Sequence, residues 1–311
     1  MSKIVKVFAP ASVANLAVGY DILGLAIDGP GDVIEAGFHE GKGLLIQEIT
    51  GDNGMLPKDP LKNTAGFAAN QLLRFLGETS TGIYLKIHKK MPFGSGLGSS
   101  AASAAGAVFA INILLGQPLE KIDLLRFAVE GEQIADGAFH ADNVAPSLLG
   151  GIQLIRDNST LDVISLPVPK DIFVSVIHPK VSILTKDARD ILKKEVALPI
   201  VVEQTGNLAA FISSLFLKDY QLMKRSLHDK WIEPQRAQLI PHFEDIKRIA
   251  FQKNSICCSI SGAGPSIFSL FTSKEIALEF AQLAINLYSS KGLKASDYTG
   301  PINSQGCKEI L

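Results

Sequence analysis

Three glycines alternate with other residues in the stretch Pro92-Phe93-Gly94-Ser95-Gly96-Leu97-Gly98-Ser99-Ser100-Ala101-Ala102. Glycine lets backbone N–H groups turn toward a phosphate chain without a Cβ in the way, and a following helix adds its N-terminal dipole at the same point. The stretch therefore predicts a phosphate-binding loop, in which Ser99 and Ser100 cap the helix or hold a magnesium ion. The alternative interpretation is a tight strand–helix turn with a capping serine.

Two well-known phosphate motifs do not account for this loop. A P-loop reads GxxxxGK[ST], and no lysine stands in the stretch. A Rossmann loop belongs to a first βαβ unit, and an acidic residue follows it about twenty positions later at the end of a strand. Here 91 residues precede the loop, and residues 114–118 (LLGQP) offer no acid.

Strands and helices are expected on both sides of the loop, from the spacing of apolar residues. Pro10 is expected to end the first strand. The expected strands cover residues 3–9, 32–38, 43–49, 82–89, 148–155 and 171–179, with two more around a glycine-rich turn in 255–271. The expected helices follow the loop directly and cover 63–76, 119–136, 185–195, 200–217 and 274–291, with at least one in 219–252. This mixed order predicts an α+β fold, with a domain boundary near residue 165.

Composition narrows the classes of function. The length of 311 residues predicts about two domains, and a net charge of −1 gives no broad basic surface, so we expect no nucleic-acid partner. Three cysteines without a CxxC spacing indicate neither a zinc cluster nor a redox pair, and they suit a reducing cytoplasm. We expect no secretory signal and no membrane span, because the longest run of small apolar residues, 101–116, is shorter than the ~20 residues that a span needs.

Three separated motifs resemble, in their order along the chain, the kinases of galactose, homoserine, mevalonate and phosphomevalonate, which form the GHMP superfamily. The second motif is the glycine-rich loop. The first and third are Ala9-Pro10-Ala11-Ser12-Val13-Ala14-Asn15-Leu16-Ala17-Val18-Gly19-Tyr20-Asp21 and Ser261-Gly262-Ala263-Gly264-Pro265-Ser266. The resemblance covers most of the chain, and it implies that the third motif folds back beside the phosphate loop.

Further strings are similar to those of homoserine kinases within the superfamily. They are His140-Ala141-Asp142-Asn143-Val144-Ala145-Pro146 with Gly150-Gly151, Thr185-Lys186-Asp187-Ala188-Arg189, and Glu233-Pro234-Gln235-Arg236-Ala237. The resemblance implies a two-domain GHMP kinase fold. An ATP-binding domain over residues 1–165 would resemble ribosomal protein S5 domain 2, a ferredoxin-like domain would cover residues 166–311, and the active site would lie between them.

The resemblance also implies the roles of individual residues. It places ATP on Asn63 and on the loop residues Pro92, Phe93, Gly94, Ser95, Gly96, Leu97, Gly98, Ser99, Ser100, Ala101 and Ala102, and Mg²⁺ on Ser100 and Glu132. It places L-homoserine on Asn15, Asp21, His140, Asn143, Thr185, Arg189, Arg236 and Gly262. Guanidinium forks suit the carboxylate of such an acceptor, and a carboxylate suits its ammonium.

Taken without the resemblance, most of these residues have ordinary structural explanations. A lone arginine on a helix, such as Arg189 or Arg236, is usually solvated or salt-bridged, and a lone histidine is more often a structural hydrogen-bonding residue. Asn15 and Asp21 suit Asx turns in a glycine-containing loop. Glu132 has the pattern of an exposed helix residue.

The implied reaction transfers the γ-phosphate of ATP to L-homoserine, giving O-phospho-L-homoserine and ADP in threonine biosynthesis. Asp142 matches an aspartate base of some relatives, whereas homoserine kinases are thought to need no dedicated base, an asparagine here matched by Asn143 holding the hydroxyl. Two other functions stay open: a kinase of another small alcohol, such as mevalonate or shikimate, and a silent nucleotide-binding sensor. A homodimer is compatible with the sequence, which locates no interface.

Overall fold

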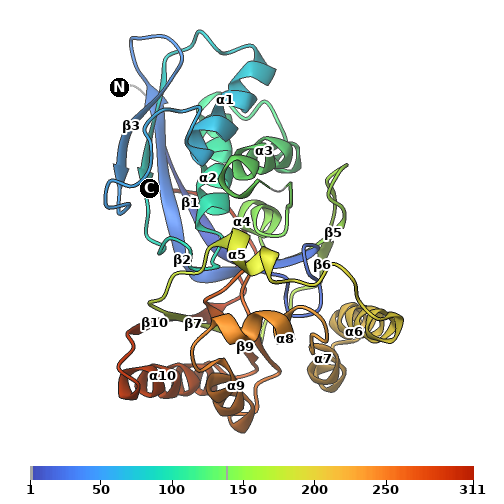
Figure 1. Ribbon diagram of the computed structural model, residues 1–311. Helices are drawn as coiled ribbons and strands as arrows, with labels where there is room; N and C mark the ends of the chain where they lie inside the picture. The colour runs from blue at the N-terminus through green and yellow to red at the C-terminus, as the bar shows by residue number, and fades with distance from the viewer. Residues whose placement is uncertain (1–2, 138) are drawn as a thin grey trace.

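Two β-sheets with their covering helices lie one above the other in the computed structural model, which describes residues 3–137 and 139–311 (Figure 1). The strands of the larger sheet run in the order β11-β1-β2-β4-β3, and β5 and β6 extend it from β2. These strands are β1 (Ile4–Ala14), β2 (Leu23–Phe38), β3 (Leu44–Thr50), β4 (Ile83–His88), β5 (Ile152–Asp157), β6 (Asp162–Leu166) and β11 (Lys308–Ile310). Pairing is antiparallel except between β3 and β4.

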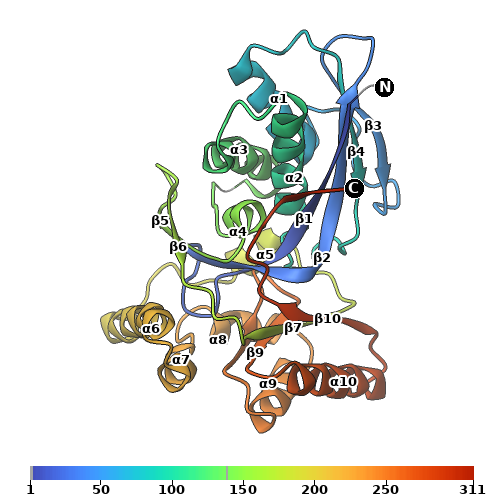
Figure 2. The same cartoon turned by 180° about the vertical axis from the view of Figure 1, so that it is seen from behind.

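Helices cover one face of this sheet, as the front and back views agree (Figure 2). They are α1 (Thr64–Leu76), α2 (Ser99–Leu114), the 3₁₀ turn η1 (Lys121–Leu124), α3 (Leu125–Asp136) and α4 (Val144–Leu149). α2 is buried along most of its length, because alanine, serine and glycine let it approach the sheet closely. A Cβ on Gly106 would lie 2.7 Å from Cγ1 of Ile34 on β2. This close packing fixes where the N-terminus of α2, and thus the phosphate loop, lies.

The smaller sheet has the strand order β10-β7-β9-β8, with every pair antiparallel. Its strands are β7 (Phe173–Pro179), β8 (Cys257–Ile260), β9 (Ile267–Phe271) and β10 (Ala295–Pro301). Numbered along the chain, this order is 4-1-3-2, which is the ferredoxin-like arrangement that the resemblance implies. α9 (Phe243–Gln252) and α10 (Lys274–Ser290) pack on it around a separate apolar core that includes Phe271, Phe280 and Tyr288.

A helical segment connects β7 to β8 and closes the space between the two sheets. It contains α5 (Thr185–Asp190), α6 (Leu198–Leu217), α7 (Tyr220–Ser226), α8 (Glu233–Arg236) and the 3₁₀ turn η2 (Ala237–Leu239) before α9. α5 and α8 lie near the middle of the molecule, whereas α6 and α7 stand at its flank (Figure 1). The predicted boundary near residue 165 stays a prediction. In the structure the chain returns to the larger sheet after β10, since β11 pairs with β1.

Several expected element bounds are wrong. Pro10 does not end the first strand, because it lies where the β1–β2 register shifts between Pro10 and Ser12, a place that tolerates a missing N–H. β2 begins at Leu23 rather than residue 32. Residues 144–149 form α4 before β5, so the strand expected at 148–155 starts late, and the helix expected at 185–195 ends at Asp190.

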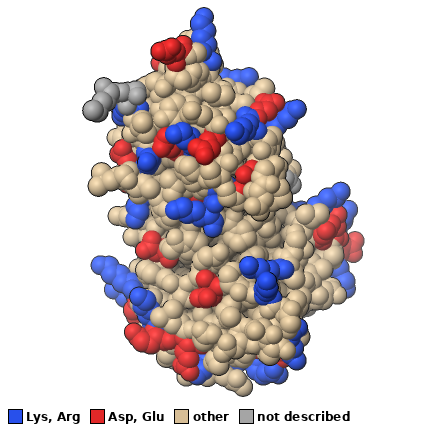
Figure 3. All heavy atoms as spheres, turned by 90° about the vertical axis from the view of Figure 1, so that its left-hand side faces the viewer, with Lys and Arg blue, Asp and Glu red and all other residues tan. Residues whose placement is uncertain are grey.

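One helix bears on the expectation about membrane spans, which stays a prediction. α6 is 20 residues long and, by length and composition alone, apolar enough to cross a membrane. Of its most apolar stretch, 22% is buried inside this protein. The apolar residues of α6 do not form an unbroken run in the sequence, because Glu203, Gln204 and Asn207 lie among them. On the face drawn in Figure 3, basic and acidic side chains lie interspersed, with no region of a single sign covering it.

Candidate active site

The phosphate loop lies at the N-terminus of α2 in the geometry that its glycines permit. Gly94, Gly96 and Gly98 all have positive φ, at 59°, 74° and 65°. A Cβ on Gly96 would lie 2.3 Å from the backbone oxygen of Ser261, so no larger residue fits there without moving the backbone. The loop therefore has both the backbone conformation and the tight surroundings that require glycine.

The third motif holds this loop from the other side. Ser261 Oγ donates to the Gly96 oxygen at 2.6 Å, and the Ser266 N–H donates to the Ser95 oxygen at 3.2 Å. The expectation that the two glycine-rich segments lie beside each other is confirmed. Since Ser266 begins the turn into β9 and Ser95 precedes α2, these bonds join the two sheets at the loop.

A cavity of about 330 Å³ opens in front of the loop. One wall is apolar and consists of Leu56, Pro57, Ile87, Phe93 and Ile183, of which the sequence analysis identified only Phe93. The predicted site residues that line it are Asn63, Phe93, Gly94, Ser95, Gly96, Gly98, Ser99, Ser100, Glu132, Asn143, Thr185 and Gly262. Leu97, Ala101 and Ala102 instead pack their side chains into the core beneath it.

Asn63 shapes the cavity through the backbone of its own segment. Its side-chain oxygen accepts from the N–H groups of Ala65 and Gly66 and so caps α1, while its Nδ2 donates to the Pro57 oxygen at 3.0 Å. Pro57 belongs to the apolar wall of the cavity. The residue expected to contact the nucleoside therefore also fixes the loop that forms this wall.

Ser100 and Glu132 come together at the cavity. Ser100, in the first turn of α2, donates to Glu132 Oε1 at 2.7 Å, and Glu132 on α3 is 8% exposed. Among the acidic residues of α3, Glu132 is the one that lines the cavity, and it is also the one that the resemblance implies. A hydroxyl oxygen and a carboxylate at the phosphate loop are hard oxygen donors of the kind Mg²⁺ takes together with substrate phosphates.

Lys89 is a site residue that the sequence analysis missed. Its ammonium forms a buried ion pair with Asp32, and it donates to the Ser99 oxygen and Ser103 Oγ, each at 2.7 Å. Burial lowers the pKa of Lys89, and the charge of Asp32 opposes that shift. Lys89 lines the cavity, and its bond to the Ser99 oxygen holds the end of the loop. Lys89 precedes the glycines of the loop, whereas the lysine of a GxxxxGK[ST] motif follows them, so the motif does not indicate Lys89.

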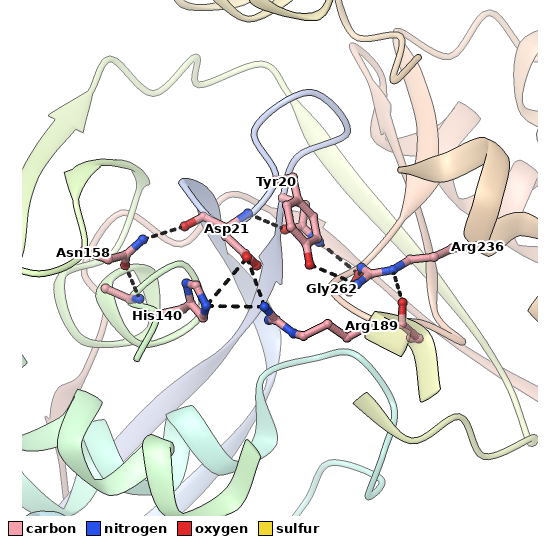
Figure 4. Close-up of polar contacts among 10 residues, drawn as sticks. Tyr20, Asp21, His140, Asn158, Arg189, Arg236 and Gly262 are labelled. Carbon is pink, nitrogen blue, oxygen red and sulfur yellow. Dashed lines mark hydrogen bonds and ion pairs between the residues drawn. The ribbon is translucent and has the colours of Figure 1, made fainter. Parts of the chain in front are cut away.

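A second polar cluster lies on the other side of the third motif (Figure 4). Asp21 Oδ2 lies 3.3 Å from Nη1 of Arg189 on α5 and 3.6 Å from Nε2 of His140. Asn158 donates to the Asp21 backbone oxygen and accepts from the Ala141 N–H, each at 3.0 Å, and so fixes the two loops. Segments far apart in the sequence therefore place opposite charges a few ångströms apart.

Arg236 on α8 completes this cluster as a buried cation, 3% exposed. Its Nε donates to the Ala188 oxygen at 2.8 Å, its Nη1 to the Gly262 oxygen at 3.1 Å, and its Nη2 to the Tyr20 hydroxyl at 3.4 Å. Burial lowers the pKa of Arg236, and it raises the pKa of Tyr20. The guanidinium has five N–H donors, so bonds to these three partners leave others to meet an anion.

Asn15 and Gly262 connect this charged cluster to the cavity. Asn15 Nδ2 donates to the Gly262 oxygen, and its Oδ1 accepts from the Asp21 N–H, both at 3.0 Å. Gly262 lines the phosphate cavity and also a small crevice beside Tyr20 and Arg236. A molecule held between Asp21 and Arg236 would therefore lie next to whatever occupies the phosphate loop.

The two residues considered for the chemical step lie next to each other at the start of α4. Asn143 lines the cavity, and its Oδ1 accepts a hydrogen bond from Ser12 at 2.8 Å. Since the amide oxygen has this partner, the amide NH₂ is the group with donors for a ligand. Asp142 is 6% exposed, and the residues lining the cavity do not include it.

Comparison with known proteins agrees with this geometry. The models of the GHMP kinases N terminal domain and the GHMP kinases C terminal domain match residues 63–151 and 209–287. A homoserine kinase of Chlorobium phaeobacteroides is 43% identical over 99% of this chain and 100% of its own length. The crystal structure of homoserine kinase from Cytophaga hutchinsonii has a TM-score of 0.97 and 47% identity, covering 100% of this chain and 98% of that one.

More distant structures share the fold. A crystal structure of mevalonate kinase has a TM-score of 0.73 at 17% identity, over 97% of this chain and 99% of that chain. At such low identity the likeness concerns the fold alone. The full-length matches at higher identity are the ones that assign a family: the chain belongs to the GHMP kinases and, among them, to the homoserine kinase family.

Proposed function

We propose that this enzyme transfers the γ-phosphate of ATP to the hydroxyl of L-homoserine, giving O-phospho-L-homoserine and ADP, as a step of threonine biosynthesis. One observation supports this assignment most strongly. Arg236 and Asn15 both donate to the oxygen of Gly262, which lines the phosphate cavity, and Asn15 also binds Asp21, so a small zwitterion held by Arg236 and Asp21 would have its far end at the phosphate loop.

Two cations and one carboxylate match the ends of an amino acid. Arg236, with donors left over from its three protein partners, would bind the substrate carboxylate together with Arg189. Asp21 would then exchange Arg189 and His140 for the substrate ammonium, which keeps the charge of the cluster balanced. Asn15 would act through Asp21 and Gly262, because both ends of its amide already bind them.

ATP would lie in the 330 Å³ cavity. Its base and ribose would pack on the apolar wall near Asn63, while the N–H groups of the phosphate loop would bind the phosphates and Lys89 would hold the end of that loop through the Ser99 oxygen. Phosphoryl transfer needs mainly alignment and neutralisation of charge, and both are available here. Thr185, at the first turn of α5, would contact the transferred phosphate from the side of the acceptor.

Mg²⁺ fits this site without a dedicated cage. Among residues 3–137 and 139–311 no group of three or more His, Cys, Asp or Glu is placed to hold a metal. Mg²⁺ typically takes one or two carboxylates and completes its shell with water and substrate phosphates. Ser100 and Glu132 would hold it, and the ion would offset the charge of the phosphate chain.

We propose that no side chain acts as a dedicated base. The Asn143 amide, oriented by Ser12, would donate to the acceptor hydroxyl oxygen and direct a lone pair at the γ-phosphate. The hydroxyl proton would leave to phosphate or water. An Asp142→Asn variant should retain activity within about tenfold, since a true general base contributes roughly 10²- to 10⁴-fold. A loss of about a thousandfold, with ATP binding intact, would make Asp142 the base instead.

Coupled ADP release with ATP–Mg and a panel of L-homoserine, mevalonate, shikimate and L-threonine tests the assignment. We expect selective turnover of L-homoserine. Arg236→Leu should abolish it while ATP still binds, and Arg248→Leu should not, because Arg248 is an exposed arginine paired with Asp245 on α9. Turnover of another alcohol would contradict the acceptor assignment, and ATP binding without turnover of any acceptor would favour a sensor.

Three expectations about the setting of the enzyme accompany this proposal. Cytoplasmic location suits Cys257, Cys258 and Cys307, which are all buried free thiols. We expect neither nucleic acid nor a membrane to be a partner of the reaction. We also expect a homodimer. Fractionation of cell extract measures the location of the enzyme, and sedimentation of the pure protein measures its oligomeric state.

A further inference from the structure

α8, the helix that carries Arg236, is only four residues long. A helix this short is not stable on its own, so contacts with the rest of the protein must set its position. At its start the Asp229 carboxylate accepts, at 2.7–3.0 Å, from the N–H groups of Trp231, Ile232 and Glu233. These bonds lie within one segment, so they shape the turn that begins α8 but do not fix where the helix lies.

Glu233 attaches α8 to the smaller sheet and its helices. It is 7% exposed, and its carboxylate forms an ion pair with Lys247 on α9 and accepts a hydrogen bond from Ser259 on β8. Burial raises the pKa of Glu233, and the charge of Lys247 opposes that shift. A buried carboxylate without a cation is strongly unfavourable, so this pair holds α8 against α9.

Glu233 and Arg236 bind the same stretch of chain from one side of α8. Residues three positions apart lie on the same side of a helix. Here that side faces β8 and the third motif, because Glu233 binds Ser259 and Arg236 donates to the Gly262 oxygen at 3.1 Å. These four residues all line the small crevice beside Tyr20. A displacement of Glu233 is therefore transmitted to Arg236 through a single helical turn.

We propose that Glu233 and Lys247 form a positioning pair, which holds Arg236 where the acceptor carboxylate binds and so sets the preference for acceptors that carry one. This inference rests on the proposed function, in which Arg236 binds that carboxylate. Neither residue of the pair is among those that line the phosphate cavity. The crevice that Glu233 lines has a volume of about 10 Å³, about the space of one water molecule, so Glu233 itself does not contact the acceptor.

Glu233→Gln tests the pair, because it removes the charge and keeps the size of the side chain. The measurement is steady-state kinetics of the full-length enzyme with L-homoserine and with 3-aminopropan-1-ol, which is the same amino alcohol without its carboxylate. The ratio of kcat/KM for the first acceptor to that for the second should fall about tenfold, since a misplacement of about 1 Å can cost up to about a hundredfold. KM for ATP should stay unchanged, which also shows that the variant is folded.

Lys247→Met tests the same pair from its other side, because methionine fills much of the space of the lysine chain without its charge. It should lower the ratio as Glu233→Gln does. The double variant should be no worse than either single one, because two residues that act as one unit do not give additive losses. Lys247→Arg keeps the charge and should keep the ratio. Additive losses, or a ratio as low in Lys247→Arg as in Lys247→Met, would overturn the proposal.

Glu279→Gln is the matched control. Glu279 on α10 pairs with Lys253, which directly follows α9, so this variant removes the same charge from another ion pair at the same helix. That pair has no contact with α8 among the ion pairs and hydrogen bonds of the described residues, and the control should leave the ratio and KM for ATP unchanged. A fall as large as that of Glu233→Gln would show a general effect of α9 and overturn the proposal.

The outcomes for the wild type and for the variants separate this inference from the proposed function. A wild type that turns over no L-homoserine would overturn the proposed function and, with it, the role of the pair. With an active wild type, an unchanged ratio in Glu233→Gln would overturn the positioning role alone. An equal fall of kcat/KM for both acceptors would do the same, because it would show a loss of structure rather than a displaced Arg236.

Discussion

Tyr20 holds the guanidinium of Arg236, which we propose binds the acceptor carboxylate. Its ring lies 5.1 Å from the Arg236 guanidinium and 6.0 Å from that of Arg189, and its hydroxyl accepts from Arg236. At the scale of a single residue, the hydroxyl thus holds one arm of the guanidinium fork, whereas the ring supports both cations. Removing only the hydroxyl should leave Arg236 in place but free to turn.

Tyr20→Phe should therefore weaken binding of the acceptor selectively. Loss of one neutral acceptor costs about 1 kcal/mol, which corresponds to roughly a fivefold rise in KM for L-homoserine, with KM for ATP unchanged. The measurement is steady-state kinetics with L-homoserine and with 3-aminopropan-1-ol, which lacks the carboxylate. An equal loss with both acceptors would contradict a role through Arg236.

Asn15 stabilises the conformation of its own loop. It adopts φ of 72°, followed by Leu16 at 40° and Ala17 at 61°, a run of left-handed residues that is unfavourable without compensation. Its side chain supplies that compensation by bonding Gly262 and Asp21. The residue expected to bind substrate is thus also the one that stabilises the loop.

Asn15→Ala should lower the free energy of unfolding by about 2–4 kcal/mol, from two lost hydrogen bonds and a Cβ-strained left-handed residue. Asn254→Ala is the control, because Asn254 is exposed with φ of 58° and should lose only about 1 kcal/mol. Chemical denaturation of both variants gives the comparison. Equal losses would show that the two side-chain bonds add nothing.

At the scale of elements, the phosphate loop and the third motif behave as one unit. Gly96→Ala should push the loop from the Ser261 backbone and raise KM for ATP more than tenfold, because a backbone contact at 2.3 Å cannot relax by rotating a side chain. Gly292→Ala is matched to it, with φ of 73° and open space around its Cβ position. That control should lose some stability and keep its KM for ATP in the same kinetic assay.

Elements could be predicted from sequence where local periodicity determined them. β4 alternates buried and less buried residues from Ile83 to His88, and α1 covers all of the expected helix 63–76 except Asn63, which is its N-cap. The elements that were missed depend on distant partners. Residues 23–31 become part of β2 because β1 and β5 pair with them, and the three residues of β11 form a strand only because β1 offers an edge.

The residues of the candidate site likewise fall into those that the sequence predicted and those that it did not. Glycines and the resemblance placed the loop, Glu132, Arg189 and Arg236, since their signal lies in the order of motifs along the chain. Lys89 and Tyr20 could not be predicted as site residues, because their roles depend on neighbours that are distant in the sequence. These are a buried carboxylate for Lys89 and two guanidiniums for Tyr20. The apolar wall of the cavity is assembled from separate segments, so no single stretch of sequence indicates it.

At the scale of the whole molecule, stability should depend on the buried His178 and the half-buried His228. Burial lowers the pKa values of His178 and His228 below the ordinary value near 6.5. Below that pH the two histidines bind more protons in the unfolded chain than in the folded protein. The free energy of unfolding should therefore fall as pH decreases. The slope should reach at most about 2.7 kcal/mol per pH unit for the two groups.

Urea unfolding at pH 7.5, 6.5 and 5.5 measures this dependence, and His178→Gln should flatten it. His178 contacts Ser266 Oγ at 3.2 Å, and glutamine can keep that hydrogen bond without titrating. Stability that stays constant or rises toward pH 5.5 would show that other groups govern the acid limb.

The pairing of β11 with β1 also bears on how the enzyme is made in a cell. Lys6, Val7 and Phe8 leave the ribosome before the other strands, yet their partners Ile310, Glu309 and Lys308 emerge only after the remaining strands of both sheets have been translated. During that interval the edge of β1 stays open to any other strand, and nascent chains on one messenger are close neighbours. Synthesis at high density should therefore favour entangled chains, and a chaperone that shields the β1 edge until translation ends would raise the yield of active enzyme.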